Sequence, residues 1–129
     1  FFFFLSNPHV EHDIEVQNYL KNTLDKMASL GLHDQIVGGF YRYCIDQQWH
    51  IPHFEKMLYD QAMMSISYSL GYKKFEDPQY LEIIKQIIFS LDDTFRIHDL
   101  YMSGHDADTD HEEGTTYLWT SDELKEKEK

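Results

Sequence analysis

Apolar residues recur at helical spacing in three stretches of the chain. In the first, over about residues 9–30, acidic side chains crowd the early turns and Gly31 follows the last apolar position. Acidic groups stabilise the amino end of a helix, and a glycine just after the last turn ends many helices. The spacing therefore predicts an amphipathic helix whose apolar positions are Ile14, Leu20, Leu24, Met27 and Leu30.

Two further helices are predicted downstream. One runs over residues 54–70, is introduced by Pro52 and closes on Gly71. The other begins with Asp77 as N-cap and Pro78 in the first turn, and its apolar positions nearly encircle the axis, so it needs partners on several sides. The buried face of the middle helix is predicted at Phe54, Met57, Leu58, Gln61, Ala62, Ile66 and Leu70, with Met63 and Met64 as core filler.

The segments around these helices alternate in the manner of short strands. Residues 40–45 are predicted to pair with residues 49–51 in a hairpin that follows Gly38 and Gly39. Residues 100–119 repeat the style, with a short strand, an acidic loop, a glycine and a second strand that ends in Trp119. Residues 120–124 resemble the start of a helix, and residues 1–13 are expected to pack as a hydrophobic strand or coil.

Helical hairpins joined by long aromatic loops on one rim are typical of an (α/α) toroid, whose cavity opens at those loops. A closed ring of six hairpins needs roughly 300 residues, whereas this sequence has three complete helices. The fold class predicted is mainly α, a fragment of an (α/α)6 toroid with short β-hairpin-like loops. Residues 1–120 form the partial toroid domain, and residues 121–129 form a charged, frayed tail.

Composition narrows the function. The chain has 129 residues, 42% of them hydrophobic, which predicts one ordered domain. Its 23 acidic residues outnumber 11 basic ones, so no basic surface is available for nucleic acid. A single cysteine, Cys44, forms no internal disulfide and indicates a reducing, cytoplasmic setting. Residues 1–13 are too short for a membrane span and lack the basic start of a signal peptide.

Residues 38–64 concentrate histidine, carboxylate and aromatic side chains at the predicted start of the middle helix. There His53 is expected to act as an acid or base near neutral pH, although a capping role is the alternative. Glu55, Asp106 and Asp108 complete the predicted catalytic group, and all four are expected to share one surface depression. Lys56 and Asp60, four residues apart, are expected to form a solvated ion pair.

A second group is predicted to bind a ligand, because aromatic faces and polar groups together suit a sugar. The alternative for each aromatic residue is packing of a hairpin onto a helix end. The predicted substrate-binding residues are Arg42, Tyr43, Trp49, His50, Tyr59, Asp60 and Trp119.

Metal sites are not predicted. In the spacing His50-x-x-His53-x-Glu55, a proline interrupts any ligand geometry. The acidic loop that starts at Asp106 resembles half of a calcium loop, but His111 stands where glycine is required and Tyr117 where glutamate belongs. No cofactor is predicted either.

One run is specific enough to indicate a family. The sequence from Pro52 to Asp60, PHFEKMLYD, resembles the thioredoxin-domain-containing, spermatogenesis-associated protein 20-like family, in which a thioredoxin-like domain precedes a toroid similar to that of N-acylglucosamine 2-epimerases. The resemblance covers about residues 24–120. No CxxC motif is present to carry a redox role. The other matching residues are Gly38, Gly39, Phe40, Arg42, Tyr43, Trp49, Asp106, Ala107, Asp108, Glu113, Gly114, Tyr117 and Trp119.

The resemblance implies a carbohydrate-type cavity. The function predicted for the chain itself is that of a non-catalytic toroid fragment that carries part of this rim, with a small carbohydrate as ligand. The alternative is a sugar isomerase or epimerase that uses His53 as general acid and base when the toroid is complete. Uncovered helix flanks predict a homo-oligomer, through residues 1–5 and 80–91, or contact with the remainder of a longer parent chain.

Overall fold

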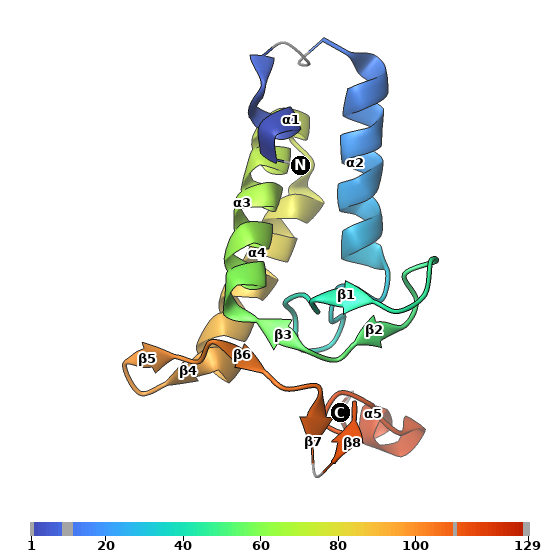
Figure 1. The fold of residues 1–129 in the computed structure, drawn as a ribbon, viewed down its shortest axis with the longest axis vertical. Helices are drawn as coiled ribbons and strands as arrows, with labels where there is room; N and C mark the ends of the chain where they lie inside the picture. The colour runs from blue at the N-terminus through green and yellow to red at the C-terminus, as the bar shows by residue number, and fades with distance from the viewer. Residues whose placement is uncertain (1, 9–11, 110, 128–129) are drawn as a thin grey trace.

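The computed structural model describes residues 2–8, 12–109 and 111–127, and it is mainly helical. Three long helices run along the longest axis of the molecule, and all the short strands gather toward one end (Figure 1). No helix in the described part of the chain is long and apolar enough to cross a membrane. The helices are α1 (Phe2–Ser6), α2 (Ile14–Ser29), α3 (Leu58–Phe75), α4 (Pro78–Ser90) and α5 (Ser121–Lys127), and α4 continues into a π-helical turn, Leu91–Phe95.

The first predicted helix is confirmed as α2. Asp13 is its N-cap, and its carboxylate accepts hydrogen bonds from the backbone N–H groups of Glu15 and Val16 at 3.1 and 3.2 Å. Gly31 directly follows the C-cap Leu30, as predicted, although its φ is not in the left-handed region. A Cβ there would lie 2.5 Å from the backbone oxygen of His50, so glycine is required for a close approach of two loops.

The middle helix begins later than predicted. Residues Pro52–His53 form strand β2 and residues Lys56–Met57 form strand β3, so α3 starts only at Leu58. The sequence-based start was wrong because the backbone groups of this stretch pair with other strands instead of with a helical turn. The helix also passes through Gly71 and ends at Phe75, followed by Glu76 with a left-handed φ of 54°.

Gly71 is the point where α3 packs most tightly against its neighbours. A Cβ there would lie 2.6 Å from Leu24 of α2 and 3.2 Å from the ring of Tyr80 of α4. We expect Gly71→Ala to destabilise the chain by about 1–3 kcal/mol, although alanine favours helix, because the core is already filled. Urea unfolding measures this, with the exposed Ser69→Ala as control, and a stabilised Gly71→Ala variant would contradict the packing described.

The last long helix, α4, matches its prediction. Asp77 accepts a hydrogen bond from the N–H of Gln79 at 3.1 Å, and Pro78 occupies the first turn. Its inner face buries Tyr80, Ile83, Ile87 and Ser90, whereas Leu81, Ile88 and Phe89 are exposed.

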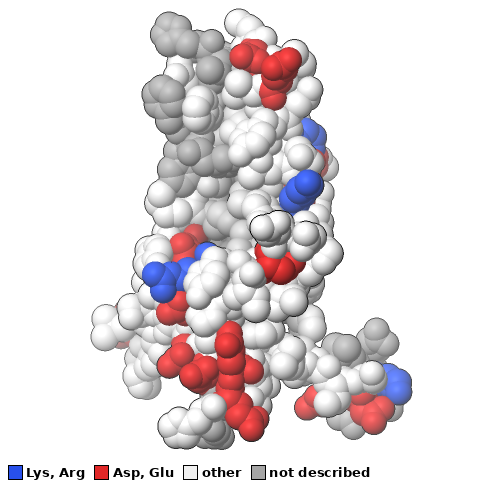
Figure 2. All heavy atoms as spheres, turned by 45° about the vertical axis from the view of Figure 1, so that its right-hand side comes forward, with Lys and Arg blue, Asp and Glu red and all other residues white. Residues whose placement is uncertain are grey.

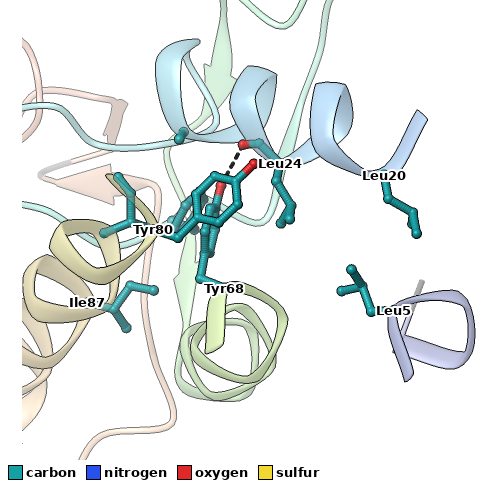
Figure 3. Packing of buried hydrophobic residues seen from close by; sticks show 9 residues of the cluster. Leu5, Leu20, Leu24, Tyr68, Tyr80 and Ile87 are labelled. Atoms are coloured by element: carbon teal, nitrogen blue, oxygen red, sulfur yellow. Dashed lines mark hydrogen bonds between the residues drawn. The ribbon is translucent and has the colours of Figure 1, made fainter. Parts of the chain in front are cut away.

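The core lies between the long helices (Figure 3). The hydroxyl of Tyr68 donates to the backbone carbonyl of Leu24 at 2.9 Å, so a polar tip is satisfied inside an apolar cluster. Residues 2–6 are helical, which corrects the strand or coil expected there, and Leu5 of α1 is buried in this cluster. Met64 packs against the core, but Met63 is 45% exposed and is not core filler.

The short strands form four antiparallel pairs. A hairpin is present where one was predicted, between β1 (Tyr43–Cys44) and β2, but its second strand is Pro52–His53 and not residues 49–51. The predicted second hairpin is wrong in detail, because residues after Gly114 form a turn instead of a strand that ends in Trp119. The other strands are β4 (Arg96–Ile97) with β5 (Leu100–Tyr101), β6 (Gly104–His105) with β3, and β7 (Asp108–Thr109) with β8 (Glu112–Glu113).

The start of the final helix was predicted correctly. Thr120 accepts a hydrogen bond from the N–H of Glu123 at 3.3 Å, and the Glu123 carboxylate accepts one from the N–H of Thr120 at 2.7 Å. This reciprocal arrangement is a capping box, and it opens α5.

Candidate functional site

The residues predicted to carry function lie at the strand-bearing end of the helical bundle (Figure 1). The segment between α2 and α3 meets there with the segment that follows α4. Carboxylates gather over this part of the surface (Figure 2). The side chains fall into two groups, which we name the arginine cluster and the histidine cluster.

The arginine cluster consists of Arg42, Glu55, Tyr59 and Asp60. The guanidinium of Arg42 donates to the Glu55 carboxylate at 2.8 Å, and the Arg42 backbone N–H donates to the Glu55 carbonyl at 2.9 Å. Glu55 lies between β2 and β3, before α3 begins at Leu58. The double contact fixes one carboxylate and one cation beside the first turn of α3.

Asp60 is the unusual member of the arginine cluster. Its Oδ2 atom is buried and accepts no hydrogen bond from the described residues. Burial raises the pKa of Asp60; Arg42 opposes this increase, and Glu55 adds to it. A carboxyl group in such a position favours its protonated form more than a solvated aspartate does, and it is suited to donate a hydrogen bond or a proton.

The histidine cluster consists of Tyr43, His53, Asp108 and Glu113. His53 Nδ1 lies 2.8 Å from Oε1 of Glu113, and the imidazole stacks on the ring of Tyr43 with centroids 4.8 Å apart. In the β7–β8 pair Asp108 stands directly opposite Glu113. The prediction that His53 starts a helix was wrong, because it lies in β2, and a carboxylate orients it instead of a helix end.

The two clusters adjoin along the chain, because Arg42 directly precedes Tyr43 of β1. The described surface has four hollows that lie elsewhere, and none of these four is lined by His53, Glu55, Asp106 or Asp108. The single depression expected for these four residues therefore stays a prediction.

The other predicted ligand contacts have structural partners. Trp49 has a left-handed φ of 61°, and its carbonyl accepts a hydrogen bond from Gly31 at 2.7 Å. The N–H of His50 donates to Asp46, whose carboxylate organises the whole turn. Trp119 is half-buried just before α5. The Asp106 carboxylate accepts from the backbone N–H of Asp108 at 3.2 Å.

Lys56 does not form the solvated pair with Asp60 that its spacing predicted. Its ammonium is buried, donates to Asp34 at 2.7 Å and to the Gly38 carbonyl at 2.9 Å, and lies 4.9 Å from the ring centroid of Tyr41. Burial alone would raise the pKa of Asp34, but Lys56 and two backbone N–H groups bring it below its usual value. Burial lowers the pKa of Lys56, and the Asp34 carboxylate opposes this decrease. The contact joins β3 to the loop that follows α2.

Gln61 holds the glycine loop that leads into β1. Its amide oxygen accepts from the N–H of Phe40, and its amide nitrogen donates to the Phe40 carbonyl, both at 2.7 Å. Gly38 and Gly39 have φ values of 84° and 78°, a conformation that favours glycine. The sequence predicted that Gln61 lies on the buried face of the helix, but it did not predict these hydrogen bonds to Phe40. The one indication of them was a polar residue at a predicted core position.

Among the described residues, no group of three or more histidine, cysteine, aspartate or glutamate side chains is arranged to hold a metal ion. This end of the molecule offers an oriented imidazole, a partly buried carboxyl group and an arginine–carboxylate pair. The fold and these clusters define a mainly helical chain with a polar, aromatic rim at one end.

Comparison with known proteins finds similar proteins in mammals and in a nematode. The chain is 37% identical to spermatogenesis-associated protein 20 of Mus musculus over 134 aligned residues, 98% of this chain, and 36% identical to the protein of the same name in Homo sapiens. It spans only 17% of the length of each. It is also 53% identical over 57 residues to an uncharacterized protein of Caenorhabditis elegans, which covers 44% of this chain and 8% of that one. No family model matches the chain.

Proposed function

We propose that this chain forms one segment of a larger α/α toroid protein related to sugar epimerases and supplies part of the rim of a carbohydrate-binding cavity, without turnover of its own. The observation that carries the proposal is the presence of two polar clusters at one end of the helical bundle. The similarity to a segment of a much longer relative supports it.

The arginine cluster suits a polyhydroxylated ligand. Arginine and carboxylate groups held together offer donors and acceptors side by side, which is what neighbouring sugar hydroxyls require. The rings of Tyr43 and Tyr59 are 46% and 50% exposed, so each presents an aromatic face to a ligand. In the proposed longer protein both rings would line the cavity. That protein would be cytoplasmic.

Catalysis by the isolated chain is not expected, because the candidate groups are open to water. The His53 side chain is 27% exposed and that of Glu113 is 52% exposed. Proton transfer from carbon requires a substrate held in one orientation and shielded from solvent. The remaining walls of such a cavity would come from other hairpins.

The second candidate function is sugar isomerisation or epimerisation by the complete protein, and the His53–Glu113 contact favours it. An imidazole oriented by a carboxylate suits a general base. It would take the proton from the carbon next to the carbonyl of an open-chain sugar. A second acid, for which Asp60 is the candidate, would return a proton to the enediolate.

A direct test uses the purified chain with aldoses and N-acyl hexosamines, followed by ¹H NMR. We expect no interconversion, but we expect millimolar sugar to shift the amide signals of Arg42 and His53. Sustained conversion that is lost in His53→Ala would overturn the non-catalytic assignment and support the second candidate. Absence of any shift at either cluster would count against carbohydrate binding.

The outer face of α4 carries a separate prediction about partners. Ile88 and Phe89 are 52% and 62% exposed, whereas Tyr80, inside the interface expected from sequence, is buried in the chain's own core. We propose that a neighbouring hairpin of a longer parent, or a second copy, covers this face. We expect the chain to dimerise at micromolar concentration and the pair Ile88→Glu and Phe89→Glu to be monomeric. Sedimentation velocity at 0.15 M salt is the measurement, and a wild-type monomer would contradict the prediction.

A further inference from the structure

The imidazole of His53 is held on two sides by different parts of the chain. Its Nδ1 atom lies 2.8 Å from a Glu113 carboxylate oxygen of β8, and its face stacks on Tyr43 of β1 at an interplanar angle of 19°. The two contacts fix both the plane of the ring and the direction of one nitrogen. Because β2 and β8 are far apart in sequence, the geometry depends on the folded rim.

The chemistry of the partner determines which nitrogen carries the proton. An ionised carboxylate only accepts hydrogen bonds, so Nδ1 must donate to Glu113. In the neutral imidazole the proton then resides on Nδ1, and Nε2 has an unshared electron pair. Asp108 lies opposite Glu113 on β7, but the carboxylate that contacts Nδ1 is that of Glu113.

We infer that Glu113 is a positioning residue that fixes the Nδ1–H tautomer of His53 and so makes Nε2 a proton acceptor for ligands that present a hydroxyl or an acidic C–H group. This inference deepens the proposed carbohydrate function and rests on it for the class of ligand. The tautomer itself follows from the contacts of this chain. Glu113 was not among the candidate site residues predicted from the sequence.

The test is ¹⁵N NMR of the complete chain labelled at histidine and observed at about pH 8, where free histidine is neutral. Signals of His53 are assigned by their loss in His53→Gln. We expect Nδ1 to be protonated and Nε2 unprotonated, with the Nδ1–H form favoured roughly tenfold or more, as a hydrogen bond to a charged partner implies. In Glu113→Gln the amide can donate as well as accept, so the preference should be lost.

Asp108→Asn is the matched control, because it changes the opposite carboxylate without removing the hydrogen bond to His53; its Nδ1–H preference should persist. Retained signals of the half-buried His105 show that each variant is folded. A predominantly Nε2–H or doubly protonated His53 in the wild type would overturn the inference, as would an unchanged tautomer in folded Glu113→Gln.

Sugar titration of the same sample separates this inference from the proposed function. An Nδ1–H tautomer together with no response of Nε2 to sugar supports the positioning role and counts against carbohydrate as the ligand. A shift of Nε2 on addition of sugar supports both. The opposite tautomer refutes the positioning role whatever the sugar does.

Discussion

Replacing Asp34 by alanine is expected to lower the free energy of unfolding by about 3–5 kcal/mol, the range found when one partner of a buried ion pair is removed. Its partner Lys56 has a side chain only 3% exposed, so the ammonium would remain buried beside Tyr41 without its counter-charge. Urea unfolding at neutral pH measures the loss. The exposed Asp99→Ala is the control and should change stability by less than about 0.5 kcal/mol.

The same pair predicts a pH dependence. Because the folded-state pKa of Asp34 is depressed, its contribution is present above the unfolded pKa of about 4 and is lost as the pH falls through the folded value. The Asp34→Asn variant should therefore lose less stability than the wild type on acidification. Equal acid sensitivity of the two folded proteins, or a cost of Asp34→Ala below about 1 kcal/mol, would contradict a buried ionised pair.

Substituting Gln61 by leucine is the second change with a large expected effect. The leucine fills similar space but leaves both the N–H and the carbonyl of Phe40 without partners in a fully buried position. Each unsatisfied group costs about 1–3 kcal/mol, so we expect a loss of roughly 2–5 kcal/mol.

The function-related part of this prediction is local. Phe40 lies two residues before Arg42, so release of the loop should also disturb the Arg42–Glu55 contact, which ¹H–¹⁵N spectra report. The exposed Gln86→Leu on α4 is the matched control and should leave both stability and these signals nearly unchanged. A Gln61→Leu chain as stable as the control would show that the loop finds other partners.

The elements that local chemistry determines were predictable from the sequence. Asp77 caps α4 as expected, and Thr120 with Glu123 opens α5. In each case the signal and its structural partner lie within a few residues. Capping depends on neighbours along the chain, so a single sequence is sufficient to read it.

The errors arise where pairing joins distant segments. Residues 54–57 have apolar spacing compatible with a helix. In the structure, however, Lys56 and Met57 pair with His105 and Gly104 of β6, and no feature of the nearby sequence predicts this pairing. A helix-like pattern of apolar residues over a single turn is weak evidence for a helix, because hydrogen bonds to a distant strand can decide the backbone conformation instead.

The candidate site shows the same limit. His53, Arg42 and Asp60 were found because unusual polar residues stand out in a short stretch. The contact of His53 with Glu113, which orients the imidazole, joins residues far apart in the sequence. The same is true of the buried contact of Lys56 with Asp34. The nearer candidate partner, Asp60 for Lys56, was favoured by spacing alone and was wrong.

The most direct test of the proposed function is an experimental structure of a longer relative, such as spermatogenesis-associated protein 20 of Mus musculus, in which this segment has its neighbours. The account predicts that the segment is flanked by further helical hairpins and that the counterparts of His53 and Arg42 face one shared cavity. Counterparts that lie on an outer surface, away from any cavity, would contradict it.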